Sequence, residues 1–412
     1  MLHRTGARVQ EERVVIRRTG AGAAIAGACA LAAGAATAGI WSPGLGVGAR
    51  IERWQSGALP ERDVLVQTVT PELGYGTGAG DWAVQLLAAR RYEFSRAGAG
   101  PGPSAVGAAD CSSLHLGRSW SETSDAAIDA RYDRTPEILD VPERTAFVPG
   151  DVTRWVGSAR ASLWRLEGEG RVQGWSYSAR GADDASSFAW SARFLPVLGR
   201  DGAWFIGWHE RRLELDGRTA VRSRMATLGV RRRLTPLLAG ELEVGGAAAD
   251  YRDGARERGP ALILGLTGAS GAQSLTTRWT LEPDLATGFS AEIGHELGDG
   301  RLWARGESLL DVEGGVYRVP TITRRLTLGA QDTLARSTVL GCQAGCTRAA
   351  PHHFAGEGTQ SARASAWLVR RLSPWLVGRG EWSYLRLLAS EGAAVTPQHR
   401  ARFDVTLTAA WD

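Results

Sequence analysis

Cysteine and histidine residues near position 350 are the first candidates for chemistry in this sequence. Cys342 and Cys346 are four residues apart, and His352 and His353 follow them closely. Two thiolates and two imidazoles could hold a zinc ion in a tetrahedral site, although this spacing is irregular. In an oxidising compartment, two cysteines in one external loop can form a local disulfide. We therefore predict a disulfide between Cys342 and Cys346 and no metal site.

The pair His295-Glu296 is half of the helix motif that zinc proteases use. The second histidine of that motif is absent, and the surrounding residues alternate like a strand. No serine, histidine and aspartate occur in the sequence context of a nucleophile elbow. The sequence therefore offers no catalytic residues and no cofactor site, and it predicts a protein that is not an enzyme.

A larger set of arginines and glutamates alternates with apolar residues, and we expect it to line the lumen of a barrel. Its members are Arg91, Glu93, Arg222, Arg224, Glu241, Glu243, Glu292, Arg305, Glu307, Arg379 and Glu381. Such side chains solvate a pore wall and pair across strands, or they set a selectivity field for a charged solute. Because this set contains both positive and negative charges, we expect weak ion selectivity.

The elements that position these side chains are clearest at the C-terminus. One face of the segment from Arg402 to Trp411 carries Phe403, Val405, Leu407, Ala409 and Trp411, and the other carries Arg402, Asp404, Thr406 and Thr408. Ten residues with a period of two are what a tilted strand needs to cross a bilayer. Similar alternation recurs along the chain, with charged residues on one face and aromatic or aliphatic residues on the other.

Turn signals separate these segments and predict a meander of antiparallel strands. Gly298-Asp299-Gly300 and Asp216-Gly217 are hairpin signals, and an Arg-rich strand that ends in a Leu-Ser/Thr-Pro turn occurs twice, at 231–236 and 370–374. Short connections near 167–170, 234–236, 298–300 and 372–374 alternate with longer ones near 96–109, 134–150, 313–320 and 342–357. We predict an all-β fold, a transmembrane antiparallel up-and-down β-barrel of about 18 strands, within a range of 14 to 20.

The composition agrees with a barrel and excludes other classes. The mean hydropathy of −0.17 is typical of strands that alternate polar and apolar residues, and no run after the first 38 residues is apolar enough for a membrane helix. The 16 tryptophans suit a membrane interface. The net charge of +4 shows no clustered basic excess, so we expect no nucleic-acid partner. Every basic residue except histidine is arginine, which fits codon bias rather than function.

The N-terminal segment predicts export. Residues 19–38 are rich in alanine and glycine, they follow Arg17-Arg18, and Ala36-Thr37-Ala38 is a small-x-small cleavage site. We assign residues 1–38 to a signal peptide and residues 39–412 to the barrel. A twin-arginine signal and a lipoprotein cysteine at Cys29 are the alternative interpretations, and each of them also takes the chain out of the cytoplasm.

Two stretches resemble a proteobacterial family of outer-membrane β-barrels associated with exosortase or exopolysaccharide loci. The first is Asp63 to Phe94, with Val69-Thr70-Pro71-Glu72-Leu73 and Tyr92-Glu93-Phe94; the second is Arg131-Tyr132-Asp133-Arg134, through Asp151-Val152, to Ser158-Ala159-Arg160-Ala161-Ser162-Leu163. The resemblance implies a barrel with a transport or envelope role and brings no catalytic residues.

The leading functional hypothesis is an outer-membrane pore or export channel, in a Gram-negative bacterium, for a polar solute or a polysaccharide. A structural or adhesive barrel with a plugged lumen is the second hypothesis, and a barrel enzyme that acts on lipid or peptide is the third. The expected partners are outer-membrane lipid, the barrel-assembly machinery, and polysaccharide or small polar solutes. The sequence does not determine the oligomeric state.

Overall fold

The computed structural model describes residues 40–56, 62–79, 82–97, 105–121, 124–137, 149–177, 184–199, 202–281, 288–311, 320–352, 358–388 and 398–410. Residues 1–38, the predicted signal peptide, lie outside these ranges, as does Trp411. The described part of the chain contains no helix with the length and apolar content that a membrane-spanning helix needs.

The described chain forms 20 strands that are antiparallel throughout, which places the strand count at the upper end of the predicted range. The strands are β1 (Ile40–Ser56), β2 (Arg62–Ala79), β3 (Trp82–Ala97), β4 (Ala105–Ser121), β5 (Ser124–Glu137), β6 (Pro149–Leu163), β7 (Leu166–Tyr177), β8 (Ala185–Leu198), β9 (Gly202–Leu215), β10 (Arg218–Thr235), β11 (Leu238–Tyr251), β12 (Arg256–Ser270), β13 (Gln273–Leu281), β14 (Gly288–Leu297), β15 (Gly300–Asp311), β16 (Thr321–Ala335), β17 (Thr338–Pro351), β18 (Thr359–Ser373), β19 (Leu376–Leu388) and β20 (Gln398–Ala410).

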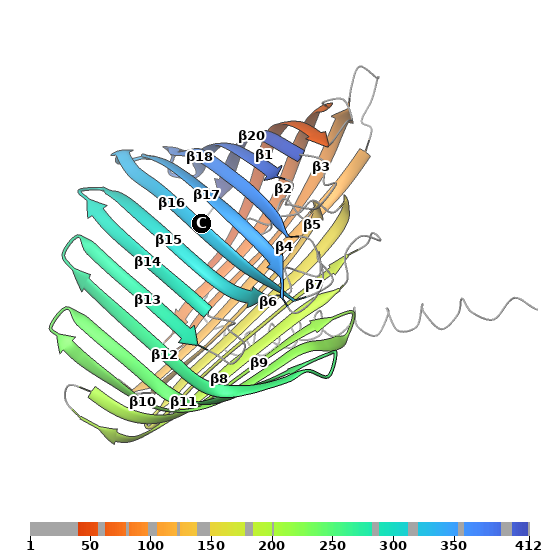
Figure 1. Ribbon diagram of the computed structural model, residues 1–412. Helices are drawn as coiled ribbons and strands as arrows, with labels where there is room; N and C mark the ends of the chain where they lie inside the picture. Colours follow the sequence, from red (N-terminus) through yellow and green to blue (C-terminus); the bar gives the residue numbers. More distant parts are fainter. Residues whose placement is uncertain are drawn as a thin grey trace, which may run out of the picture.

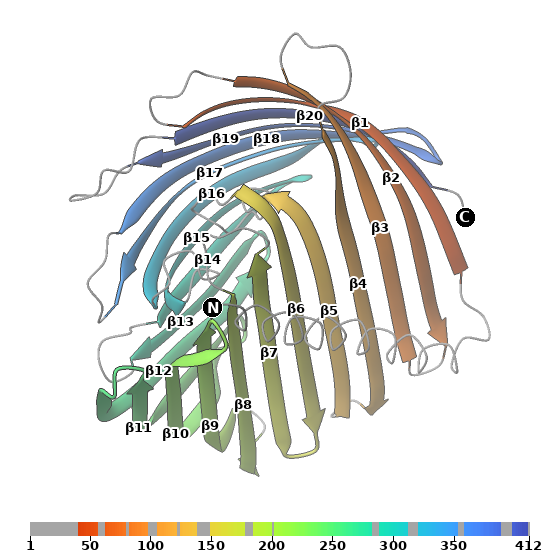
Figure 2. The same ribbon diagram turned by 90° about the vertical axis from the view of Figure 1, so that its right-hand side faces the viewer.

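Each strand pairs with its neighbours in the sequence, and the first strand pairs with the last. Val47 of β1 lies opposite Val69 of β2 on one side and opposite Leu407 of β20 on the other. This closure leaves no edge strand, so each of the 20 strands is paired with a neighbour on both sides. Figures 1 and 2 show the closed wall, with β1 and β20 on the side opposite β9 to β11.

The connections between strands alternate in length, as the sequence predicted. From β2–β3 to β18–β19, the connections after even-numbered strands have two or three residues. Those after odd-numbered strands have four to eleven residues, except for the two-residue turn between β9 and β10. Because such barrels have short periplasmic turns and longer external loops, the short-turn end is the periplasmic one.

Two tight turns require left-handed backbone angles, and their residues can adopt them. Asp216 and Gly217 have φ angles of 50° and 69°, the left-handed pair that joins two antiparallel strands with matching twist. Gly298, in the turn between β14 and β15, has a φ of 60°. Left-handed backbone is costly for residues with a Cβ, so glycine is favoured there.

The outer face of the wall is apolar in a band with aromatic residues at both ends. Exposed tryptophans lie near the short-turn end of the strands: Trp41, Trp82, Trp120, Trp164, Trp204 and Trp375. A second exposed group lies nearer the other end: Tyr92, Phe94, Phe188, Trp208, Trp279, Trp382 and Phe403. Between them, exposed leucines and valines such as Val47, Leu264 and Leu407 share the same face. This exterior is that of a barrel that spans an outer membrane.

One expected loop is a strand instead. We predicted an external loop near 342–357, but β17 runs from Thr338 to Pro351 and pairs with β16 and β18. Its outer face carries the small residues Cys342, Ala344 and Cys346, opposite glycines and Gln343 on the inner face. Alternation between small residues gives a weak strand signal, so the pairing of neighbouring strands decides this segment.

The left-handed turn gives a stability prediction. In Gly298→Ala the added Cβ meets nothing within 4 Å, so backbone strain alone should lower the free energy of unfolding, by about 1 kcal/mol. Gly380→Ala is the control, because its Cβ also meets nothing within 4 Å and its φ is ordinary. Urea unfolding of the barrel in lipid vesicles, followed by tryptophan fluorescence, measures both. Equal losses would contradict the assignment of the strain to φ.

Candidate functional site

The lumen face follows from the strand register. Residues directly opposite each other in antiparallel strands point to the same side of the sheet. On β1 the exposed apolar side chains of Leu45, Val47 and Ile51 face outward, so Arg50 and Glu52 face inward. Carried from pair to pair around the barrel, this alternation assigns every described strand, and most inward residues within the bilayer zone are charged, polar or glycine.

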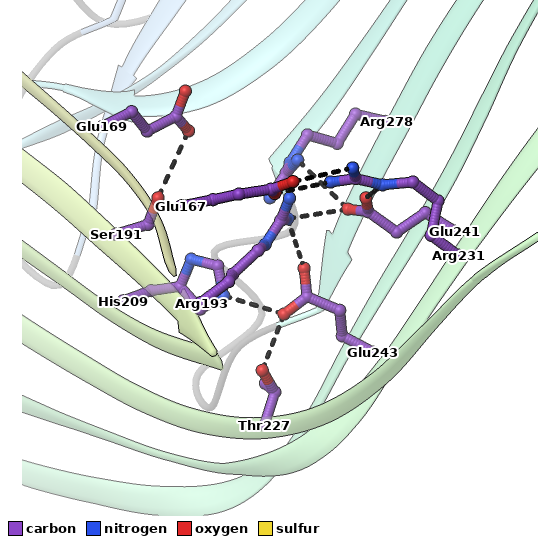
Figure 3. Close-up of polar contacts among 10 residues, drawn as sticks. All are labelled: Glu167, Glu169, Ser191, Arg193, His209, Thr227, Arg231, Glu241, Glu243 and Arg278. Atoms are coloured by element: carbon purple, nitrogen blue, oxygen red, sulfur yellow. Dashed lines mark hydrogen bonds and ion pairs between the residues drawn. The ribbon is translucent and has the colours of Figure 1, made fainter. Parts of the chain in front are cut away.

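A dense group of polar contacts lies on the inner face of β7 to β13 (Figure 3). We call it the lumen cluster: Glu167, Glu169, Ser191, Arg193, His209, Thr227, Arg231, Glu241, Glu243 and Arg278. Its members come from six strands, and their side chains point toward one another.

Glu243 lies at the centre of the lumen cluster and is completely buried. Its carboxylate accepts hydrogen bonds from Arg193 at 2.7 Å and from Thr227 at 2.6 Å, and it contacts His209 Nε2 at 2.8 Å. A Cβ at position 207 would lie 2.6 Å from the Thr227 hydroxyl and 3.1 Å from the Glu243 carboxylate. Glycine at that position therefore leaves the room that the buried carboxylate needs.

Arg193 joins two carboxylates over an aromatic ring. One of its nitrogens lies 2.7 Å from Glu241 and 2.7 Å from Glu243, and its guanidinium carbon lies 4.9 Å from the centre of the Phe205 ring. The ring in turn covers Gly229, where a Cβ would lie 2.4 Å from it. A guanidinium held between carboxylates and a ring is fixed in orientation.

Arg231 bridges strands that are not neighbours. It binds both carboxylate oxygens of Glu167 at 3.3 and 3.1 Å, and its Nε binds Glu241 at 3.2 Å. Glu167 is on β7 and Arg231 is on β10, so the inner face between these strands is bent enough for their side chains to meet. This bidentate contact fixes the curvature of the wall at the lumen cluster.

The serine and the histidine of the lumen cluster bind different glutamates. Ser191 lies opposite His209 in the register, but its hydroxyl donates to Glu169 at 3.3 Å. The Nε2 of His209 is directed to Glu243 instead. The arrangement orders a bent, polar wall and does not activate a hydroxyl group.

A second network crosses the seam where the two ends of the barrel meet. Arg400 of β20 donates to Glu52 of β1 at 2.6 Å, and Arg50 binds both oxygens of Glu93 at 3.2 Å. Arg50 also pairs with Glu52, and Arg91 pairs with Glu93 at 2.8 Å. These pairs connect side chains of β20, β1 and β3 on the inner face of the seam.

Three cavities of about 540 to 610 Å³ lie along the lumen face. The cavity of about 540 Å³ is lined from two walls that are far apart in strand order, β7 to β9 and β15 to β19. Arg171 and Arg211 line both this cavity and the one of about 550 Å³ beside the lumen cluster. The lumen therefore holds connected spaces lined by polar side chains.

An apolar group narrows the lumen at its external end. Val152, Trp175, Leu213, Leu215, Val221 and Tyr251 pack together on the inner face of β6 to β11, with Leu310 of β15 in the same cluster and Ile322 of β16 packed against it. The rings of Tyr251 and His352 lie 6.3 Å apart, which joins β11 to the end of β17. We call this group the apolar bridge. Its described residues come from β6 to β11, the turn after β11, β15, β16 and the end of β17, and none come from β1 to β5 or β18 to β20.

The register places the eleven expected lumen residues on two faces. Nine lie on the lumen face: Arg91, Glu93, Glu241, Glu243, Glu292, Arg305, Glu307, Arg379 and Glu381. Arg222 and Arg224 lie on the outer face instead, opposite Arg212 and Glu210, and both of them pair with Glu210.

The reason for this reversal is the apolar bridge. At the external ends of β9 and β10, Leu213, Leu215 and Val221 point inward, so the residues between them point outward. This part of the wall has the pattern of a soluble protein, with apolar side chains inside and charged ones outside. A lumen assignment based on charge alone is therefore wrong for Arg222 and Arg224.

The expected disulfide is also wrong. Cys342 and Cys346 are free, exposed, and on the outer face of β17. Four residues of strand separate their Cα atoms by roughly 13 Å, well beyond the reach of a disulfide. No group of three or more histidine, cysteine, aspartate or glutamate residues is arranged to hold a metal ion among the described residues, and His353 lies outside them.

Several residues of the lumen networks were missed from the sequence. Arg193, Arg231 and Glu167 meet across non-adjacent strands, and Arg50, Glu52 and Arg400 meet across the seam. The alternation of polar and apolar residues along each strand could have shown that each of these side chains faces the lumen. Their partners depend on curvature and closure, which single strands do not reveal.

Comparison with known proteins finds similar structures among outer-membrane porins but does not assign the chain to a family. No protein-family model matches the chain, and no curated protein matches it. Among solved structures, the chain is similar to OccK2 (OpdF) of Pseudomonas aeruginosa, at 12% identity and a TM-score of 0.42, with coverage of 90% of this chain and 98% of that one. It is similar to OccK1 (OpdK) of the same organism, at 12% identity and a TM-score of 0.41, with coverage of 90% of this chain and 99% of that one. It is also similar to OccAB3 of Acinetobacter baumannii, at 8% identity, a TM-score of 0.38, and coverage of 90% of this chain and 99% of that one. Similarity at this level does not identify a solute.

The buried carboxylate gives the second prediction. Glu243→Gln should lower the free energy of unfolding by about 3 kcal/mol, because it removes the charge that Arg193 and His209 face in a buried site. Glu381→Gln is the control: its pair with Arg379 is partly exposed and should contribute less than about 1 kcal/mol. Urea midpoints measure both, and a loss in Glu381→Gln as large as in Glu243→Gln would show that burial is not what matters.

Proposed function

We propose that the protein is a passive outer-membrane channel for small polar solutes. The observation that supports this most is the contrast between the two faces of a closed barrel: the outside carries an apolar band, and the inside carries arginines, glutamates and connected cavities. A polar solute that enters such a lumen exchanges water for charged and hydrogen-bonding side chains.

The size of the cavities favours small solutes over a polymer. Cavities of about 540 to 610 Å³ match the volume in which proteins bind small molecules. The fixed ion pairs of the lumen cluster, such as Arg231 with Glu167, extend from the wall into the same space. We therefore favour small solutes, and not a polysaccharide, as what passes.

The path we propose runs past the apolar bridge rather than through it. The bridge closes part of the external end, between β6 to β11 on one side and β15 and β16 on the other. The longest stretch of wall without a described bridge residue runs from β18 through β20 and β1 to β5. Solutes would therefore pass along the wall formed by β18 to β20 and β1 to β5.

A second candidate function is a structural barrel with a closed lumen. The apolar bridge supports it, because apolar side chains packed across a lumen exclude water and ions. The two candidates differ in one measurable property, the passage of ions and small solutes.

Planar-bilayer recording and liposome swelling test the channel. The purified barrel should give stable channels, and vesicles that contain it should swell faster in glucose than in a linear oligosaccharide of six or more sugars. The protein used should show the mobility difference between boiled and unboiled samples that marks an intact barrel. Folded protein without stable conductance or swelling would overturn the channel and favour the structural barrel.

A further inference from the structure

Three arginines near the external end of the outer face have no acidic partner among the described residues. They are Arg324 of β16, Arg348 of β17 and Arg386 of β19, and these strands lie side by side with β18 in the wall (Figure 2). All three side chains are exposed, and none makes a hydrogen bond or an ion pair with a described residue. We call them the outer arginines.

The strand register shows that the outer arginines point away from the lumen. Their immediate neighbours in the sequence, Arg325, Thr347 and Leu385, line the lumen cavity of about 540 Å³. Because successive side chains of a strand point to opposite faces, the outer arginines lie on the outside. There they share a face with Leu326 and Trp382, which are exposed in the apolar band.

Their height in the wall is that of the lipid head groups. Arg324 is separated along β16 by ten residues from the exposed Leu334, at the short-turn end. Arg386 is separated by ten residues from Leu376, at the start of β19. A tilted strand of about 9 to 11 residues crosses the hydrocarbon of a bilayer, so these arginines leave it at its external border.

The charges of the outer arginines repel one another. Arg324 lies directly opposite Arg348, and like charges in that position destabilise a pair of strands. The other polar residues opposite the outer arginines are Ser308, Gln360 and His399, and none of them is acidic. An anion bound between the guanidinium groups would remove this repulsion.

Several other exposed arginines on the outer face have a carboxylate beside them. Ion pairs join Arg90 to Asp110 at 3.4 Å, Arg212 to Glu214 at 2.7 Å and Arg222 to Glu210 at 2.6 Å. The described part of β15 to β20 offers the outer arginines no such carboxylate. A negative partner for them must come from outside the described chain.

We infer that the outer arginines bind a phosphate-bearing glycolipid of the outer leaflet. The lipid of that leaflet carries phosphate groups on its sugars, at the border of the hydrocarbon. Guanidinium groups bind phosphate through parallel hydrogen bonds, and Arg324 and Arg348 have Cβ atoms roughly 5 Å apart, so they can share one phosphate. This partner goes beyond the proposed channel and does not depend on conduction.

The wall below the outer arginines accommodates an acyl chain. The outer face of β17 and β18 carries a strip of small side chains there: Cys342, Ala344, Cys346, Ala362, Ala364 and Ala366. The flanking strands carry larger side chains, Leu326 and Leu328 on β16 and Trp382 and Tyr384 on β19. A chain along this strip contacts the wall beneath it and larger side chains on both sides. The strip begins directly below Arg348, so a head group and its chain can bind together.

Lipid binding to the purified barrel in detergent tests the site. The probe is lipid A with two phosphates; dephosphorylated lipid A, phosphatidylglycerol and inorganic phosphate are the comparisons. Mass spectrometry of the intact complexes measures the lipids, and titration calorimetry measures the phosphate. We expect the phosphorylated lipid A to bind most tightly.

Each comparison can overturn one part of the inference. Equal binding of the two forms of lipid A would overturn the role of the arginines. Equal binding of phosphatidylglycerol would overturn the choice of the glycolipid. Inorganic phosphate that binds as tightly as the lipid would make this a site for a soluble anion and overturn the lipid.

Matched arginine variants locate the head group. Arg348→Gln should weaken the binding of phosphorylated lipid A about fivefold, and Arg348→Gln with Arg324→Gln about 25-fold, since each basic residue at an anionic lipid surface contributes about that factor. Arg258→Gln is the control, because Arg258 is exposed on the outer face of β12, opposite Ala248, and has no described partner. All variants should keep the gel mobility of an intact barrel. An effect of Arg258→Gln as large as that of Arg348→Gln would overturn the site.

A second pair of variants tests the acyl chain. Ala364→Phe fills the middle of the strip and should weaken the binding of lipid A without changing that of inorganic phosphate. Ala226→Phe is the control, because Ala226 is exposed on the outer face of β10, away from the strip. Equal effects of the two variants on lipid A would overturn the place of the chain. Lipid A binding by a barrel that does not conduct would contradict the proposed channel and support this site.

Discussion

The pairing of β1 with β20 closes the sheet into a barrel. A bilayer has no water to satisfy backbone groups, so a sheet can cross it only when no edge is left open. The register from Gly44–Ala410 to Ser56–Gln398 provides this closure over the whole of β20 and from Gly44 to the end of β1. Buried ion pairs, such as Arg400 with Glu52, add side-chain contacts across the same seam. Closure creates an inside and an outside, and every functional assignment follows from that distinction.

The wall contains two zones with opposite patterns. In the bilayer zone the outer face is apolar and the inner face is charged. At the external ends of β9 to β11, Leu213, Val221 and Tyr251 point inward and form the apolar bridge, while Glu210 and Arg222 point outward. The bridge joins this extended part of the wall to β15 and β16. The lumen is thus narrowed by the same packing that stabilises soluble proteins, and the charged wall begins below it.

The sequence predicted the fold well and the side-chain networks less well. Period two in β20, the tight turns and the alternation of connection lengths were enough to predict an antiparallel barrel, because these signals are local. The rule that charged residues of an alternating strand face the lumen misplaced Arg222 and Arg224. At the apolar bridge the apolar residues face inward and the charged ones outward, because these parts of the strands lie outside the bilayer. It also placed Cys342 and Cys346 in a loop, because small residues and glycines hide the strand pattern of β17. Contacts such as Arg231 with Glu167 depend on the bending of the wall, which no single strand encodes.

In the proposed channel, alternate residues of the strands face lipid and a water-filled lumen. Spin labels on single cysteines in β20 test this alternation, with the native cysteines changed to alanine and the barrel in lipid vesicles. Labels at Val405 and Leu407 should collide readily with oxygen, which concentrates in lipid. Labels at Thr406 and Thr408 should collide with a water-soluble nickel complex, because these residues pair inward with Gly48 and Gly46. Accessibility that does not alternate, or nickel collisions that are absent at both threonines, would show that these residues do not alternate between lipid and a water-filled lumen.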